Sequence, residues 1–326
     1  MPTSLRIATF NLENLDEKPN QKPTLAERIA VMQPQLDRIR ADVLCLQEVN
    51  GQEQPGQPRQ LLALQKLIAG TDLAGFYQEY TRTQVGEACD ERNLVVLSRY
   101  PITEFREIKH WKVDPPAYRP VTEEPRPAAA SDRTWERPIC YAKIQLPGRV
   151  LHVINLHLKS KLPTDIKGQK TADDRWKTVA GWAEGFFISS MKRVGQALET
   201  RVFLDSLFKA DENALIAVCG DFNGEADDVP VQAIRGDVED TENTEHVLSV
   251  MIPCERTVPE PARFSLIHHG KGCMFDHLLV SRPLLAFSRG TEIHNELLHD
   301  ESVAFAVDVK FPESDHAPVV AAFELP

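Results

Sequence analysis

The sequence predicts one α/β domain with mixed β-sheets. Two observations support this fold class. Short apolar runs typical of strands alternate with segments of helical periodicity along the whole chain, and no linker or change of composition divides the 326 residues. The hydrophobic content of 42% and the charged content of 26% are ordinary for a globular protein with a buried core. We therefore expect a single domain that spans residues 1–326.

Strands and helices alternate in the first hundred residues. Apolar runs predict strands at 5–10, 42–47 and 93–98, and helical spacing predicts helices at 25–40 and 61–69. The apolar stripe of the first helix consists of Leu25, Ile29, Met32, Leu36 and Ile39, and Thr24 is placed to cap it.

Residues 103–137 break this pattern. The segment is rich in proline and charge, with prolines at positions 115, 116, 120, 125 and 127. Proline removes a backbone donor and fixes φ, so the segment is expected to form neither a regular helix nor a central strand. We expect a long excursion and a candidate flap over a cleft.

The second half of the chain returns to alternation. Strands are predicted at 141–145 and 150–156, joined by a turn at Pro147 and Gly148, and residues 172–209 are predicted to be mainly helical. Four further apolar runs predict strands at 215–219, 275–280, 304–309 and 319–325.

Composition and charge limit the classes of function. The formal net charge of −11 argues against a protein that grips nucleic acid through a broad basic face, although a bound divalent metal could supply positive charge at a phosphate. The first residues do not resemble a signal segment, and no run of 18 apolar residues predicts a membrane span. The six cysteines are widely spaced, so we expect a cytoplasmic protein without a disulfide framework.

Polar residues repeatedly follow the ends of the apolar strands. They are Asn11, Glu48, Asn155 with His157, Asp221 with Asn223, Asp276 with His277, and Asp315 with His316. Alternation along extended backbone places Asp221 and Asn223 on the same side of their strand. An acid and an amide so placed suit a hard cation, a phosphate oxygen or an attacking water, whereas the same motif alone also makes ordinary turns. Several carboxylates and histidines at equivalent positions favour a functional site, because buried charge is costly unless it is paired or metal-bound.

Six short segments, taken in order, resemble the endonuclease/exonuclease/phosphatase superfamily, which includes DNase I. They are ATFNLEN at 8–14, CLQEV at 45–49, NLHLKS at 155–160, GDFN at 220–223, FDHLLVS at 275–281 and SDHAPV at 314–319. The resemblance implies a four-layered α/β sandwich, in which two mixed sheets pack face to face with helices outside. It also implies hydrolysis of a phosphoester that depends on Mg²⁺ or Mn²⁺.

The resemblance further implies a role for each matching residue. Glu48 corresponds to the principal metal ligand, with Asn11 and Asp315 beside it. Asp221 matches the residue that orients or deprotonates the attacking water, and Asn223 the residue that holds a phosphate oxygen. His316 would stabilise the phosphoryl group with its ring fixed by Asp276, and His157 matches the second histidine of the DNase I and sphingomyelinase branches. Arg137, Asn155 and Lys159 are weaker candidates for contacts with the substrate phosphate.

These expectations lead to a ranked set of functions. The leading hypothesis is a metal-dependent phosphodiesterase, with a nuclease acting on DNA or RNA preferred. A phosphomonoesterase, or a phosphodiesterase for lipids or small molecules, is the alternative, because the chain is acidic. A non-catalytic binding protein on the same fold is a distant third. No protein partner is indicated.

Overall fold

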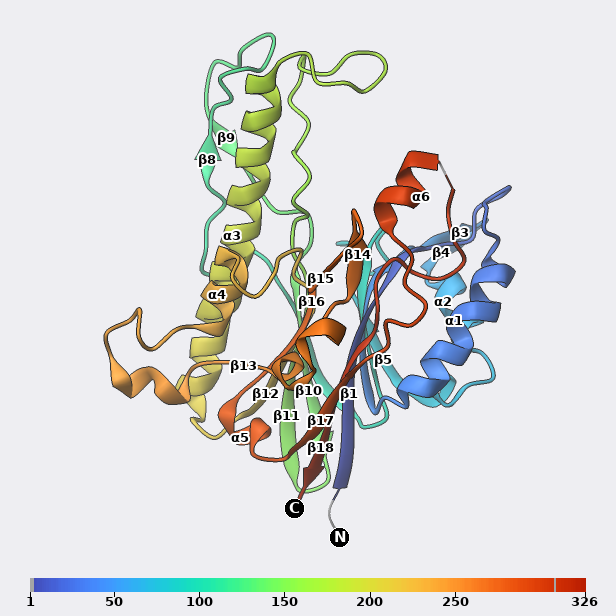
Figure 1. The fold of residues 1–326 in the computed structure, drawn as a ribbon, viewed down its shortest axis with the longest axis vertical. Coiled ribbons are helices and arrows are strands. Elements are labelled where there is room, and N and C mark those ends of the chain that lie inside the picture. The colour runs from blue at the N-terminus through green and yellow to red at the C-terminus, as the bar shows by residue number, and fades with distance from the viewer. Residues whose placement is uncertain (1–2, 308) are drawn as a thin grey trace.

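Two six-stranded sheets form the centre of the molecule in the computed structural model, which describes residues 3–307 and 309–326 (Figure 1). The first sheet has the order β17 (Ser288–Ile293), β18 (Val319–Leu325), β1 (Thr3–Leu15), β2 (Val43–Val49), β6 (Asn93–Ser98) and β5 (Tyr77–Tyr80). The second has the order β13 (Ile252–Pro253), β16 (Asp276–Val280), β12 (Leu215–Asp221), β11 (Arg149–His157), β10 (Ile139–Leu146) and β7 (Ile102–Ile108).

Both sheets are mixed, as the sequence predicts. β1 and β2 are parallel in the first sheet, β11 and β12 are parallel in the second, and the other neighbouring strands are antiparallel. Each parallel pair carries its two carboxyl ends to one edge of its sheet. Polar residues that the sequence predicts for a functional site lie at these two edges.

The layers follow from the burial of apolar faces. One core cluster lies between the sheets and draws on alternate residues of both, such as Ile7, Val153 and Ala217. A second cluster packs α1 (Leu25–Ile39) and α2 (Leu62–Ile68) on the outer face of the first sheet, and a third packs α3 (Val179–Ala210) and α4 (Val229–Arg235) on the second. The result is the expected four-layered sandwich, so the predicted fold class is confirmed.

Local sequence explains where α1 begins and ends. The Thr24 hydroxyl accepts a hydrogen bond from the backbone N–H of Glu27, and the Glu27 carboxylate accepts one from the backbone N–H of Thr24, which completes a capping box. Arg40 ends the helix with left-handed backbone angles, φ 49° and ψ 41°.

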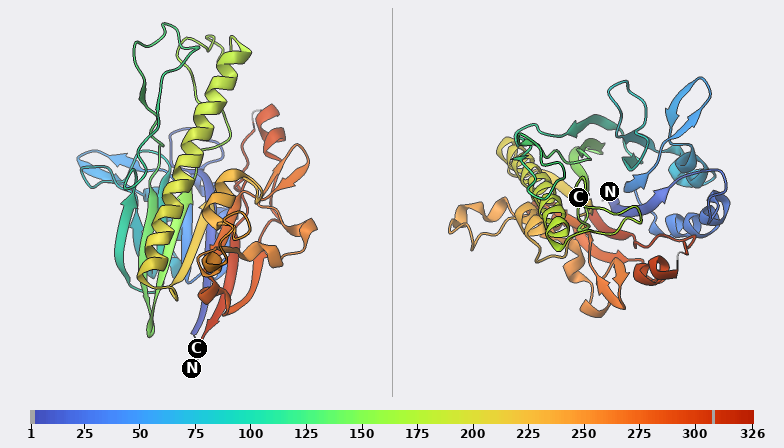
Figure 2. Two further views of the ribbon diagram at one scale, coloured as in Figure 1. Left: turned by 90° about the vertical axis from the view of Figure 1, so that its left-hand side faces the viewer. Right: turned by 90° about the horizontal axis from the view of Figure 1, so that it is seen from above.

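An arm stands on the sandwich beside the edge where the parallel pairs end (Figures 1 and 2). We define the arm as residues 109–137 and 158–195, so it consists of the first half of α3 and two segments that lie along it. Both segments are hydrogen-bonded to α3: Trp111 N donates to Glu199, and Thr164 N donates to Gly185 O. Residues 109–137 therefore lie against α3, and the expected flap over a cleft is not formed.

The structure corrects other expectations for individual segments. Residues 102–108 form β7, an edge strand, because their prolines come only later, from position 115 onward. Residues 172–178 are not helical, and Thr178 caps the helix that follows. Residues 301–307 form the short helix α6 (Glu301–Val307) where a strand was predicted over 304–309; residue 308 lies outside the described residues.

Small elements complete the fold. They are the hairpins β3 (Gln52–Gln54) with β4 (Gln57–Gln60), β8 (Ala117–Tyr118) with β9 (Ser131–Asp132), and β14 (Leu266–His268) with β15 (Lys271–Cys273), and the short helix α5 (Arg282–Leu285). Within the described residues, no helix has the length and apolar character that crossing a bilayer requires.

Candidate active site

Strand register brings three predicted site residues together on the second sheet. His157 is the last residue of β11 and lies opposite Asp221, the last residue of the parallel strand β12. Asp276 begins the antiparallel strand β16 and pairs with Asp221 on the other side. Residues paired across neighbouring strands point to the same face, so the three side chains share one surface at the edge of the sheet.

The first sheet adds residues from the other side of the sandwich. Asn11 in β1 donates from Nδ2 to Asp221 Oδ2 at 3.0 Å, which joins the two sheets at their common edge. Glu48 in β2 has φ 58°, and its Oε2 accepts a hydrogen bond from Asn14 N at 3.0 Å. Its other oxygen lies 3.6 Å from His157 Nε2.

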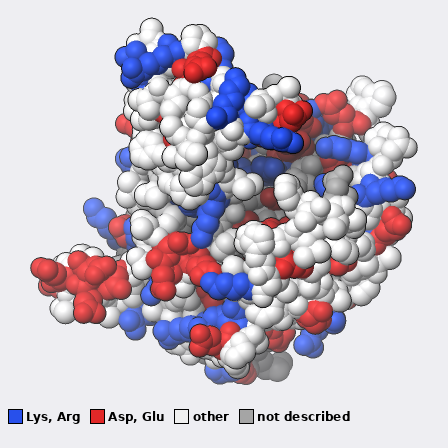
Figure 3. Space-filling view, turned by 45° about the horizontal axis from the view of Figure 1, so that its top comes forward, with Lys and Arg blue, Asp and Glu red and all other residues white. Residues whose placement is uncertain are grey.

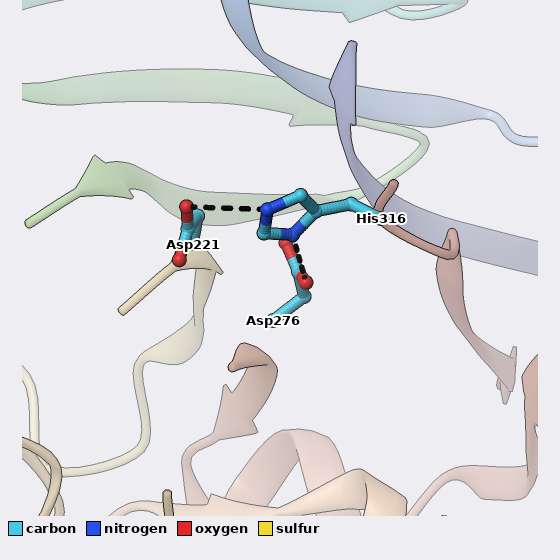
Figure 4. A group of neighbouring side chains, drawn as sticks. All are labelled: Asp221, Asp276 and His316. Carbon is cyan, nitrogen blue, oxygen red and sulfur yellow. Dashed lines mark hydrogen bonds and ion pairs between the residues drawn. The ribbon is translucent and has the colours of Figure 1, made fainter. Parts of the chain in front are cut away.

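His316 lies between two aspartates (Figure 4). Its Nδ1 is 2.7 Å from Asp276 Oδ2, and its Nε2 is 3.9 Å from Asp221 Oδ2. The hydrogen bond to Asp276 fixes the orientation of the ring, so Nε2 faces Asp221 and the space beside it. Asp276 is itself held, because its backbone N–H donates to Ser265 Oγ at 3.0 Å.

The charges around His316 set its protonation. Burial lowers the pKa of His316, but the carboxylates of Asp276, Asp221 and Asp315 outweigh burial and hold it well above its usual value. Burial raises the pKa of Asp221 to about 7, although the charge of His316 opposes this shift. Near neutral pH the site therefore contains a protonated imidazole next to a carboxyl group that exchanges its proton readily.

His157 has the opposite electrostatic environment. Burial and then the charge of Arg137 bring the pKa of His157 well below its usual value, so the ring is neutral. Its Nε2 lies 3.4 Å from Asp221 Oδ2, and its buried Nδ1 has no hydrogen-bond partner among the described residues. The two histidines therefore differ in charge although both contact Asp221.

Asn223 supports Asp221 directly. Its backbone N–H donates to Asp221 Oδ1 at 2.8 Å, and its Nδ2 donates both to Asp221 Oδ2 and to Leu158 O. The residue has φ 49°, a conformation that asparagine tolerates better than most residues. Because both hydrogens of Nδ2 are used inside the protein, a contact from this group to a phosphate oxygen would break one of these bonds.

Glu48 and Asp315 could hold a hard cation. Asp315 Oδ1 is buried and accepts no hydrogen bond within the described residues, which leaves a ligand position free. Burial raises the pKa of Asp315 to about 6, and the negative charge of Glu48 adds to this effect. Two carboxylates, one of them with a buried oxygen that accepts no hydrogen bond, fit Mg²⁺ or Mn²⁺, which prefer oxygen ligands. Asn11 is less available, since its Oδ1 already accepts from Glu13 N.

Another group satisfies simple distance criteria for a metal. The ligand atoms of Asp221, Asp276 and His316 all lie within 4.8 Å of one another. However, His316 Nδ1 and Asp276 Oδ2 are hydrogen-bonded to each other at 2.7 Å, so neither is free to bind an ion. These three residues are better suited to holding and moving a proton.

The three weaker candidates for phosphate contact have different positions. Arg137 is buried, and its guanidinium donates to His157 O and Leu158 O at the end of β11. Asn155 is fully buried between the sheets, where it bonds Gln47, Leu46 O and Val95 O, and its amide has no contact left for a substrate. Lys159 is half-buried, and its Nζ has one neutral partner, Ser160 Oγ at 3.2 Å.

The structure also identifies polar residues that the sequence did not assign to the site. Glu13 accepts from Asp315 N, and burial with the charge of Asp315 raises the pKa of Glu13 to about 7. Its position two residues after Asn11, within the segment 8–14, was the available signal. Behind the site, the buried ring of His277 contacts Glu255 at 2.7 Å and Gly224 O at 2.8 Å, so both ring nitrogens face acceptors. The contact with Gly224 O helps to fix the turn at 220–224.

Fold and site together describe a four-layered sandwich whose shared edge carries carboxylates, amides and histidines. The sequence profile of the Endonuclease/Exonuclease/phosphatase family matches residues 8–316, and the chain belongs to this family, whose members are phosphoesterases. No curated protein matches the sequence.

Solved structures of similar fold cover nearly the whole chain. Truncated TDP2 from Caenorhabditis elegans is 15% identical with a TM-score of 0.59, and the match covers 98% of both chains. The 3′ phosphatase NExo from Neisseria, bound to a product DNA hairpin, is 17% identical with a TM-score of 0.54 over 98% of this chain and 99% of that one. An AP endonuclease from Archaeoglobus fulgidus is 16% identical with a TM-score of 0.53 and the same coverage. At these identities the likeness establishes the fold alone.

Proposed function

We propose that this protein is a divalent-metal-dependent phosphodiesterase that hydrolyses nucleic acid. The observation that carries the proposal is the placement of His316, 2.7 Å from Asp276 and 3.9 Å from Asp221 at the shared edge of the two sheets. It supplies, side by side, a proton donor and a proton acceptor, which are the two groups that hydrolysis of a phosphoester requires. The similar fold of a 3′ phosphatase bound to a DNA hairpin and of an AP endonuclease supports a nucleic-acid substrate.

Asp221 is the proposed acceptor of the proton from the attacking water. Its pKa of about 7 allows it to be ionised in mildly alkaline solution and still basic enough to take a proton. Asn11 and Asn223 hold the carboxylate in place through Oδ2 and Oδ1, so they orient the acceptor. Asn223 is thus proposed as a positioning residue for Asp221, in place of the phosphate contact that the resemblance implied.

His316 is the proposed donor to the phosphoryl oxygen. The reaction adds negative charge to that oxygen, and a protonated imidazole at hydrogen-bond distance stabilises this charge. Asp276 keeps the ring protonated and correctly oriented through Nδ1. His157 is neutral and next to Asp221, so it is proposed to offer Nε2 as a neutral contact for the water or for a substrate oxygen.

Glu48 and Asp315 would bind Mg²⁺ or Mn²⁺, with Glu13 behind Asp315. When bound, such an ion supplies positive charge to the phosphate and lowers the pKa values of the carboxylates that it touches. Lys159 and the buried Arg137 add fixed positive charge at the end of β11. These two cations would make the acidic chain attractive to a phosphodiester at this one place.

The direct test uses bis-p-nitrophenyl phosphate, single-stranded DNA, RNA and plasmid with Mg²⁺, Mn²⁺ or a chelator. We expect turnover of the diesters that the chelator abolishes, and loss of that turnover in Glu48→Gln and Asp315→Asn. Binding of Mn²⁺ by calorimetry should weaken at least tenfold in the same variants. Turnover that persists in chelator, or unchanged Mn²⁺ affinity in both variants, would contradict the proposal.

The substrate panel also addresses the other candidates. Sugar phosphates, nucleotides and sphingomyelin test the monoesterase and lipid alternatives, and turnover restricted to them would replace the nuclease assignment. All six cysteines, which lie within the described residues, are free thiols, and the cytoplasmic location stays a prediction.

A further inference from the structure

The charge of the arm differs from that of the rest of the chain. Residues 109–137 and 158–195 contain fourteen lysines and arginines against nine aspartates and glutamates, in a chain of formal net charge −11. One of the nine acids, Glu184, is buried against Tyr118 and Thr122 and does not contribute to the surface. The arm is therefore a basic appendage on an acidic molecule.

Most of these cations are available to a ligand. Within residues 3–307 and 309–326, carboxylates pair with only three of the fourteen, namely Lys161, Lys170 and Lys192. Seven of the others are exposed: Lys109, Lys112, Arg119, Arg126, Lys167, Arg175 and Lys177. Figure 3 shows lysine and arginine side chains at the top of the arm and beside the hollow at the centre of that face.

Exposed aromatic rings accompany the cations along the arm. Trp182 is 45% exposed and stacks on Phe186, with ring centroids 5.8 Å apart. Trp111 is 47% exposed, packs edge-on against Phe203, and carries Lys112 at 5.1 Å from its ring. Trp182 and Phe203 are 21 positions apart in α3, which corresponds to about 30 Å along the helix. Trp182 therefore lies toward the tip of the arm, whereas Trp111 lies beside Phe203, ten positions beyond Arg193 at the base of the arm.

The arm begins at the candidate active site. His157 ends β11 and leads directly into the segment 158–178, and Arg193 of α3 donates to Lys159 O and Ser160 O at the base of the arm. A ligand bound at Asp221 and His316 would meet the base of the arm first and could continue toward its tip. From Arg193 to Val179 the helix rises by about 21 Å, a length that a nucleic-acid strand covers with about six phosphates.

We infer that the arm is a binding wall for the part of a single-stranded nucleic acid that extends away from the scissile phosphate. The inference rests on the proposed function, because it places the reacting phosphate at Asp221 and His316. Cations that follow a backbone, interrupted by half-exposed rings on which bases can stack, are the features by which proteins hold single strands without sequence preference. The substrate is then a polymer of at least several nucleotides, and a small diester uses only the catalytic edge.

An anionic lipid surface is the other polyanion that a basic, aromatic element could bind. A membrane contact places its aromatic residues at one depth, in the interface plane. The separation of Trp182 from Trp111 along α3 does not meet this condition and favours a strand that lies along the arm.

The first test compares substrate length in the wild-type protein. With single-stranded oligodeoxynucleotides of 3 to 12 residues, KM should fall as length increases and level off at roughly eight nucleotides, once about six phosphates lie along the arm. Trp182→Ala should raise KM for the 12-residue strand roughly tenfold, because one stacked base is lost. Turnover of bis-p-nitrophenyl phosphate should stay within twofold.

The second test removes charge at the tip of the arm. Arg126→Ala, Lys167→Ala and Arg175→Ala are combined, and binding of a labelled 12-residue strand is followed by fluorescence anisotropy at several salt concentrations in chelator. The slope of log K against log salt should fall in magnitude by about 2, since each phosphate contact on a single strand contributes about 0.7. The matched control combines Arg40→Ala, Lys143→Ala and Lys209→Ala, which remove the same charge outside the arm and should leave the slope unchanged.

The outcomes separate the arm from the active site. Normal turnover of bis-p-nitrophenyl phosphate with a KM that does not depend on strand length, or an equal effect of the arm and control triples, would overturn the binding wall and leave the proposed function intact. Absence of metal-dependent turnover with intact, arm-dependent strand binding would instead remove the proposed function. Binding to vesicles of phosphatidylserine and phosphatidylcholine that is lost in the arm triple, with unchanged strand binding, would assign the arm to membranes.

Discussion

The catalytic edge and the arm both bury carboxylates, but they treat them in opposite ways. In the arm, Glu184 accepts hydrogen bonds from Tyr118 Oη, Val121 N, Thr122 N and Thr122 Oγ1. Burial opposes ionisation there, but these donors lower the pKa of Glu184 below its usual value. At the edge, Asp276 Oδ1 and Asp315 Oδ1 are buried without a hydrogen bond from any described residue, and burial raises the pKa of Asp315.

This difference separates structural from chemical use of a buried charge. A carboxylate whose acceptors are all occupied can only hold the chain around it, because any new partner must displace an existing one. A buried carboxylate oxygen without a hydrogen bond destabilises the fold, and interactions elsewhere in the protein must offset this free energy. Such an oxygen is available to a cation or a proton. Three predictions test this contrast, beginning with the one that should have the largest effect.

His316→Ala should lower kcat for bis-p-nitrophenyl phosphate by roughly 10³-fold, because the proposed proton donor and the charge that stabilises Asp221 are both lost. The measurement is steady-state kinetics with saturating Mn²⁺. His152→Ala is the matched control: His152 also contacts a neighbour through a ring nitrogen, Tyr141 Oη at 2.8 Å, but lies in the middle of β11. Equal losses in the two variants would mean that His316 acts through stability alone.

Glu184→Ala should loosen the arm and spare the catalytic edge. It leaves Val121 N and Thr122 N without their acceptor, which should destabilise the packing of residues 118–122 against α3 by roughly 2–3 kcal/mol. Amide hydrogen exchange at 118–122 should accelerate, whereas turnover of bis-p-nitrophenyl phosphate should remain within twofold. Glu123→Ala, next to these residues but without a hydrogen bond to described residues, should change neither quantity. A matching loss of small-substrate turnover in Glu184→Ala would show that the two regions are not separable.

Glu13→Gln should stabilise the metal-free protein at high pH only. The pKa of Glu13 is about 7 in the folded state and 4.5 in an ordinary environment. Below pH 4.5 the carboxyl is protonated in both states and has no effect. As pH rises to about 7 the unfolded state ionises first, so the wild type loses stability over this window. The variant should therefore gain about 3 kcal/mol at pH 8 and nothing at pH 4.

Urea unfolding in chelator at the two pH values measures this gain, and the exposed Glu212→Gln provides the control. If Glu13→Gln instead loses stability at pH 8, the carboxylate is ionised and well paired in the folded protein, and Glu13 belongs with Glu184 on the structural side of the comparison.

Local sequence predicted most of the sandwich because its signals are local. Apolar runs identified the central strands, and the position of Asp221 was readable from where its run stops. The expectation that Asp276 and Asp315 also follow strand ends was wrong, because Asp276 begins β16 and Asp315 precedes β18. The error at 304–309 has a physical reason. Its alternation of apolar and small residues fits a strand, but Val303, Phe305 and Val307 are exposed on a short helix and pack in no sheet. The apolar character of that segment therefore carried no information about its conformation.

The roles within the site were less predictable, because they depend on which partners each group finds. Asn155 and Asn223 are both amides near strand ends. The side chain of Asn155 forms its hydrogen bonds between the two sheets, whereas Asn223 holds Asp221 in place. The arm was not predictable from the sequence either. Its prolines excluded a regular helix and a central strand in 103–137 but did not indicate that residues 109–137 would lie along α3.

By itself, the sequence determined the fold class, the family and the set of polar residues at the strand ends, because these follow from periodicity and from short ordered motifs. Only the tertiary structure decided how those residues are used. Register placed His157, Asp221 and Asp276 side by side, and the packing of the two sheets brought Asn11 and His316 to them. Burial lowers the pKa of both histidines, but the carboxylates around His316 raise its pKa, so the two histidines shift in opposite directions. Desolvation and partner distance arise only when distant segments meet, so no local pattern could have fixed them.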